Sequence, residues 1–66
     1  MREFRKLQLV TEDRGDPPVP TPVAFVSFKD SDAGTFHIGI ENPPALATLQ
    51  EQVAWGVQQM VNWRKA

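Results

Sequence analysis

The chain has 66 residues, no cysteine, one histidine and a formal net charge of −1 at pH 7. These values exclude a disulfide framework and a zinc site with cysteine ligands, and they predict one small domain with a thin margin of stability. Oligomerisation is the remaining way to stabilise so short a chain, so a homo-oligomer, by default a dimer, is expected. The near-neutral charge provides no general attraction to nucleic acid, which is therefore not expected as a partner.

The sequence also argues against a membrane protein. No apolar run approaches the roughly 18 residues that a membrane span needs. The basic residues near Met1 are not followed by an apolar stretch, so no signal peptide is predicted. Together with the absence of cysteine, this pattern predicts a cytoplasmic location.

Three segments have the composition of β-strands. The first, residues 3–11, alternates so that two sets of side chains are predicted on opposite faces: Leu7, Leu9 and Thr11 on one, and Phe4, Lys6, Gln8 and Val10 on the other. The second, residues 23–29, is apolar on both faces, which indicates cover on both sides. The third, residues 35–41, alternates regularly and is expected to form an antiparallel hairpin with the second through the turn at Asp30–Gly34.

A proline-rich segment separates the first two strands. Residues 12–22 contain prolines at positions 17, 18, 20 and 22, which fix the backbone φ angle and remove hydrogen-bond donors. The segment is predicted to be an extended surface loop, too long for a tight hairpin.

A long C-terminal helix is predicted after the third strand. Asn42 has the character of an N-cap, Pro43 suits the first helical position, and the pattern continues to about Arg64. The expected fold is thus a single α+β domain over residues 1–66, with a three-stranded, largely antiparallel sheet and one long C-terminal helix, in the order β-β-β-α.

The two sides of this helix differ in character. An apolar stripe is predicted to face the sheet, formed by Leu46, Leu49, Val53, Val57 and Met60. The opposite side has one charged residue among seven, namely Thr48, Glu51, Gln52, Trp55, Gln58, Gln59 and Asn62. Trp55 on such a side predicts a binding surface, although a slight rotation of the helix would instead tuck the indole against the proline-rich loop. Gly56 indicates the close approach of a sheet residue or of a second helix across a twofold axis.

No catalytic constellation, phosphate-binding loop or metal-ligand set is recognisable, so neither enzymatic activity nor a cofactor is expected. The sequence instead predicts a small non-enzymatic binding module, a homo-oligomeric protein-interaction or inhibitor protein that uses the outer face of its C-terminal helix. The residues predicted to bind a partner are Trp55, Glu51, Gln52, Gln59, Asn62 and Trp63.

A second hypothesis is a protein that binds or sequesters a small ligand of the nucleotide type in a pocket at the subunit interface. Tryptophan stacks on rings, and glutamine and asparagine offer both donors and acceptors. The basic residues of the two ends would hold phosphates, namely Arg2, Arg5, Arg64 and Lys65.

Overall fold

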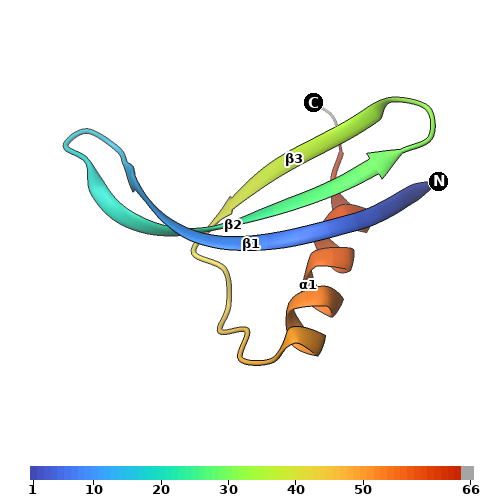
Figure 1. The fold of residues 1–66 in the computed structure, drawn as a ribbon. Helices are drawn as coiled ribbons and strands as arrows, with labels where there is room; N and C mark the ends of the chain where they lie inside the picture. The colour runs from blue at the N-terminus through green and yellow to red at the C-terminus, as the bar shows by residue number, and fades with distance from the viewer. Residues whose placement is uncertain (65–66) are drawn as a thin grey trace.

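The chain folds into one antiparallel sheet followed by one helix. The computed structural model describes residues 1–64 and contains β1 (Arg2–Arg14), β2 (Val19–Asp30), β3 (Gly34–Glu41) and α1 (Leu49–Asn62) (Figure 1). The strands are ordered β1-β2-β3 and both neighbouring pairs are antiparallel. The α+β architecture predicted from the sequence is confirmed.

The proline-rich segment belongs to a long hairpin, so the prediction of a surface loop over residues 12–22 was wrong. β1 continues to Arg14, which pairs with Val19 of β2, and only the four residues 15–18 form the turn. Gly15 enters this turn with a φ of 92°, in the left-handed region that glycine occupies without strain.

Two prolines lie inside β2 at positions where no backbone N–H is required for hydrogen bonding to β1. The N–H of Asn42 donates to the carbonyl of Pro22, so the backbone of Pro22 faces the β3 side of the strand. Because backbone direction alternates along a strand, Pro20 faces the same way. Neither residue removes a hydrogen bond to β1, and both place a ring on an edge that has no neighbouring strand.

The sheet has two ends with different surroundings. β3 pairs with β2 only as far as Val23, so beyond it β1 and β2 continue as a two-stranded ribbon, residues 11–22, which we call the arm. Figure 1 shows the arm projecting away from α1, which lies at the other end of the sheet. The molecule is accordingly elongated and measures 38 × 29 × 15 Å.

The helix crosses the strands and does not run along them. Gly56 lies against the ring of Phe4 in β1, Met60 packs with Phe28 of β2, and Trp63 contacts Phe36 of β3 with ring centroids 4.8 Å apart. The C-terminal half of α1 thus lies on β1 and β2, with the following residue Trp63 reaching β3, whereas its N-terminal half extends past the outer edge of β1 (Figure 1).

The core lies between α1 and the sheet. Val26, Phe28 and Met60 form its buried centre, and eight partly buried side chains surround them: Phe4, Leu7, Phe36, Ile38, Ile40, Trp55, Val57 and Trp63. We call the side of the sheet that carries these residues the helix face, and the other side the open face.

A register shift in β1 changes the predicted faces of that strand. The pairing with β2 slips between Phe4 and Lys6, so Arg5 is an extra residue in the ladder. Phe4 therefore joins Leu7 on the helix face, whereas strict alternation had grouped Phe4 with Lys6. Without this shift, Phe4 would point away from Gly56 and its contact with the helix would be lost.

The helix begins later than predicted. Its N-cap is Thr48, whose hydroxyl accepts a hydrogen bond from the N–H of Glu51, while the Thr48 hydroxyl donates to the Glu51 carboxylate. This is a variant of the capping box, in which the Glu51 carboxylate accepts the Thr48 hydroxyl, whereas the standard form accepts the N-cap N–H. Asn42 instead has a φ of 54° and starts an irregular connection over residues 42–48.

The helix is also rotated relative to the prediction. Gly56 and Met60 are buried and Trp55 packs against the core, whereas Leu49 is 76% exposed and Val53 is 42% exposed. The large area of the aromatic side chains explains the preference, since an indole gains more than a valine from leaving water. The predicted apolar stripe was therefore wrong for Leu49 and Val53 and right for Val57 and Met60.

The open face covers its own apolar residues. Val23 points to this face and is fully buried, and the ring of Phe25 lies across Gly39 of the neighbouring strand. A Cβ on Gly39 would come within 3.0 Å of the Phe25 ring, so glycine makes room for it. External cover for this part of β2, expected from the sequence, is not required.

Candidate functional site

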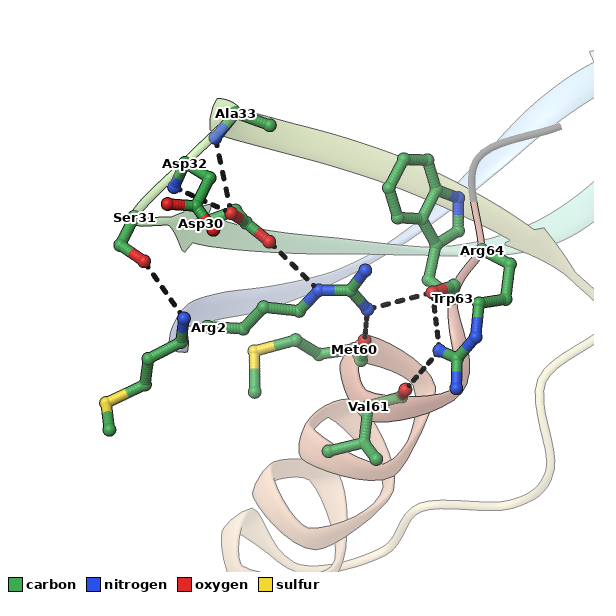
Figure 2. Close-up of polar contacts among 10 residues, drawn as sticks. Arg2, Asp30, Ser31, Asp32, Ala33, Met60, Val61, Trp63 and Arg64 are labelled. Carbon is green, nitrogen blue, oxygen red and sulfur yellow. Dashed lines mark hydrogen bonds and ion pairs between the residues drawn. The ribbon is translucent and has the colours of Figure 1, made fainter.

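The densest polar cluster joins the two ends of the chain. The Nε atom of Arg2 lies 3.2 Å from Asp30 Oδ2, and its guanidinium also donates to the carbonyls of Met60 and Trp63, the latter at 2.8 Å (Figure 2). The same guanidinium lies 5.5 Å from the ring centroid of Phe28 and 5.4 Å from that of Trp63. A cation at this position also complements the negative end of the helix dipole. Arg2 therefore fastens the C-terminal end of α1 to the sheet.

The other half of the cluster is the β2–β3 turn. Asp30 Oδ1 accepts the N–H groups of Asp32 at 2.9 Å and Ala33 at 3.2 Å, and the N-terminal amino group donates to the hydroxyl of Ser31 (Figure 2). The pKa of Asp30 lies below its ordinary value, first because the Asp32 N–H donates to it and then because Arg2 and Ala33 do so, against an opposing effect of burial. The turn is thus held by charge-assisted hydrogen bonds that need an ionised Asp30.

The residues predicted to bind anions are largely occupied by contacts within the chain. Arg64 donates to the carbonyls of Val61 and Trp63, so Arg2 and Arg64 meet at the same Trp63 carbonyl (Figure 2). Arg5 pairs with Glu3 at 3.3 Å on the surface. Lys65 lies outside the described residues. Arg2 and Arg64 thus bind carbonyls at the end of the helix, and over residues 1–64 no cluster of free guanidinium groups remains to bind an anion.

The six residues predicted to bind a partner differ in their exposure to solvent. Trp55 and Trp63 pack against the core, and Gln52 and Gln59 are half-buried beside them. Only Glu51 and Asn62 are exposed, and they are engaged locally with Thr48 and Gln58 respectively. The structure therefore separates the two tryptophans from the solvent-facing part of the predicted surface.

The solvent-facing surface of α1 has an unusual composition, and we call it the outer side of the helix. It consists of Leu49, Gln50, Glu51, Val53, Ala54, Gln58, Val61 and Asn62, of which Glu51 alone is charged. Val61 is 52% exposed, and with Leu49, Val53 and half-buried Val57 it forms a ridge at a spacing of four residues. The spacing is visible in the sequence, where Leu49, Val53 and Val57 of this ridge are predicted to face the sheet.

A serine–histidine pair lies on the open face. The buried Ser27 hydroxyl is 2.8 Å from Nδ1 of the exposed His37 on the neighbouring strand. Over residues 1–64 no further hydrogen bond orients the imidazole, so a carboxylate of the kind found in hydrolase triads is not seen there. The contact satisfies a hydroxyl on the central strand, consistent with the lack of any buried unpaired side-chain polar atom in the part of the chain that the structure describes.

Other site types find little support in residues 1–64. A shallow depression near the N-terminus is lined by Met1, Glu3, Lys29 and Ser31, which have mixed charge. Within the same range, no cluster of three or more histidine, cysteine, aspartate or glutamate residues could hold a metal ion.

No helix within residues 1–64 has the length and apolar character needed to cross a membrane.

A comparison of the chain with protein-family models finds no match, and searches of curated proteins and of solved structures likewise find none. With no relative to indicate a function, the candidate site is the outer side of α1, together with the outer edge of β1 past which the helix extends.

Proposed function

We propose that this chain is a small non-enzymatic binding module that associates with a second copy of itself, with the outer side of α1 in the contact. The observation that carries the proposal is the exposure of Leu49, Val53 and Val61 on a helix surface with one charge among eight residues. Surface helices of monomeric domains commonly carry mixed charges on their solvated side. An apolar, nearly uncharged surface is typical of a protein interface.

The energetic argument favours a second copy as the partner. Full burial of a leucine or valine side chain contributes roughly 1.5–3 kcal/mol, so a contact that covers the ridge on both copies offsets a large part of the cost of association. Because the outer side has one charge, its contact with another copy creates little repulsion between like charges. The nucleotide-type alternative is less favoured, because Arg2 and Arg64 already donate to carbonyls of α1.

Sedimentation equilibrium tests this proposal directly. The wild-type chain is expected to be dimeric at micromolar concentrations, and Val53→Glu should shift it to the monomer because a buried unpaired carboxylate is costly. Thr35→Glu is a suitable control, since Thr35 is an exposed residue of β3 away from α1. A wild-type chain that stays monomeric up to several hundred micromolar would remove the basis for the proposal.

A further inference from the structure

The outer edge of β1 has unpaired backbone groups whose positions follow from the ladder. Because Pro22 faces β3, the even-numbered residues of β2 bond to β3 and the odd-numbered ones to β1. The β1 partners of those odd-numbered residues are even-numbered, for example Gln8 opposite Phe25. It follows that the odd-numbered residues of this part of β1 direct their N–H and C=O groups outward: Leu7, Leu9, Thr11 and Asp13.

This edge differs from the neighbouring open edge in its protection. In the arm, the open edge of β2 carries Pro20 and Pro22, whose nitrogens face outward and cannot donate to another strand. Residues 6–14 of β1 contain no proline, no glycine and no register shift. An extended edge of nine residues without these features is able to accept another strand.

The charges along β1 favour a second copy of β1 as that strand. Lys6 lies near one end of the edge, and Glu12 and Asp13 lie near the other. Lys6 and Asp13 take part in no ion pair within the described part of the chain, and Glu12 uses Oε1 for Arg14, which leaves its other oxygen. Antiparallel pairing of two β1 strands centred on Leu9 would place each Lys6 opposite the partner's Glu12.

We propose that two copies join through β1 in antiparallel orientation, with Leu9 on the twofold axis, to form one continuous sheet from the three strands of each copy. This inference rests on the proposed function, since it names the contact through which the chain associates with itself. The outward backbone groups match this register: Leu9 faces the partner's Leu9, and Leu7 faces the partner's Thr11. These pairs are of the type that exchanges two hydrogen bonds.

Charge selects this register over its neighbours. If Val10 lay on the axis, Lys6 would lie opposite the partner's Arg14, and two cations opposite each other on one face are destabilising. If Gln8 lay on the axis, Lys6 would lie opposite the partner's Val10, and Glu12 would have no opposite charge facing it. Of these three registers, only the one centred on Leu9 pairs opposite charges on the open face at both ends.

The same contact explains the exposed apolar residues. The N-terminal half of α1, which carries Leu49 and Val53, extends past β1 in Figure 1, and in the dimer it would lie over the helix face of the partner's strands. There it would meet the helix face of the partner's arm, where the partner's Pro20 and Pro22 lie. Leu9, which is 47% exposed in the single chain, would be covered at the axis.

Paired charge reversals provide the test. In Lys6→Glu both facing pairs become Glu–Glu, and in Glu12→Lys both become Lys–Lys, so each variant alone should dissociate at least about tenfold more readily than wild type. In an equimolar mixture the two variants form opposite-charge pairs at both positions, so the dimer should return. Sedimentation equilibrium of each variant and of the mixture measures this, with circular dichroism to confirm that both are folded.

The controls separate this inference from the proposed function. Glu12→Lys also loses the contact with Arg14 inside its own chain, but that loss is identical in the mixture and cannot restore association. If wild type dimerises and Val53→Glu disrupts the dimer, yet the mixture associates no better than either variant alone, the β1 contact is overturned and association through α1 stands. If wild type is monomeric throughout, the proposed function itself fails.

Discussion

The two ends of the β1–β2 hairpin satisfy the same backbone in different ways. At the helix-covered end, Phe28 is fully buried and packs on Phe36 and Trp63. Side-chain packing therefore limits which residues can occupy the strands there. At the other end, Leu9 just before the arm and Val19 near the tip of the arm are about half-exposed, and proline positions and charges determine what the strands can contact. One end is built to hold the fold together, whereas the other leaves a surface and an edge available for binding.

The largest difference between the two ends is expected in core truncations. Phe28→Ala removes a ring that stacks on Phe36 and contacts Trp63, and it should lower the free energy of unfolding by about 3–5 kcal/mol. Leu9→Ala in the monomer should cost less than about 1 kcal/mol because half of the side chain is already in water. Urea unfolding at low protein concentration measures both, and equal losses would contradict the distinction between the two ends.

Replacing glycine by alanine should lower the stability more on the helix face of the sheet than on the open face. A Cβ at Gly56 would lie 2.6 Å from the Phe4 ring, so Gly56→Ala should destabilise by about 1–3 kcal/mol even though alanine is the better helix former. Gly39→Ala meets the Phe25 ring at 3.0 Å on the open face, where the ring has room to tilt outward, and should cost less than about 1 kcal/mol.

Thermal unfolding with a compensating variant sharpens this prediction. If the clash with the ring is the cause, Phe4→Leu combined with Gly56→Ala should be more stable than Gly56→Ala alone. A Gly56→Ala protein that is more stable than wild type would show that the helix does not approach β1 as closely as described.

The attachment of the helix to the sheet should depend on the shape of Arg2 as well as on its charge. Arg2→Lys keeps the charge but loses the planar fork that reaches Asp30 and two carbonyls, so we expect a loss of about 1–2 kcal/mol. Arg5→Lys is the matched control, because its pair with Glu3 is exposed and contributes little. Indistinguishable melting temperatures for the two variants would argue against the fastening role of Arg2.

The smallest effect is expected in the pH dependence. The pKa of Asp30 is lowered in the folded chain, so the stability from its ionised form is fully present above the ordinary aspartate value of about 3.9 and is lost as pH falls towards the lowered pKa. Asp30→Asn should lack this component, so the difference in stability between wild type and variant should narrow below about pH 4. Parallel pH profiles in acid denaturation experiments would exclude a role for the ionised carboxylate.

The sequence predicted the elements well and their details less well, for identifiable reasons. The third strand and the turn before it follow from regular alternation and from turn residues, and the structure places them over Gly34–Glu41 as expected. The extension of the first strand to Arg14 was missed because prolines normally interrupt strands, and nothing local reveals that Pro20 and Pro22 face an open edge. The register shift at Arg5 also could not be predicted, because it is defined only by the pairing of β1 with β2.

The error in the helix had two sources. Asn42 followed by Pro43 resembles a helix start, but the Thr48–Glu51 capping box was the better signal and was present in the sequence. The orientation could not be obtained from the periodicity alone, because aliphatic residues and tryptophans lie on different sides and compete for the sheet. Packing of Trp63 on Phe36 and of Gly56 on Phe4 decided the competition, and both contacts join residues far apart in the chain.

The bond between Arg2 and the Trp63 carbonyl joins residues 61 positions apart. During synthesis, the aromatic cluster cannot close until residues 2–63 have all left the ribosome, because it joins the beginning of β1 to the residue that follows α1. A growing chain of this kind holds its hydrophobic strands without cover until that moment. We therefore expect these residues to remain unfolded until α1 has been synthesised and then to fold together in a single step.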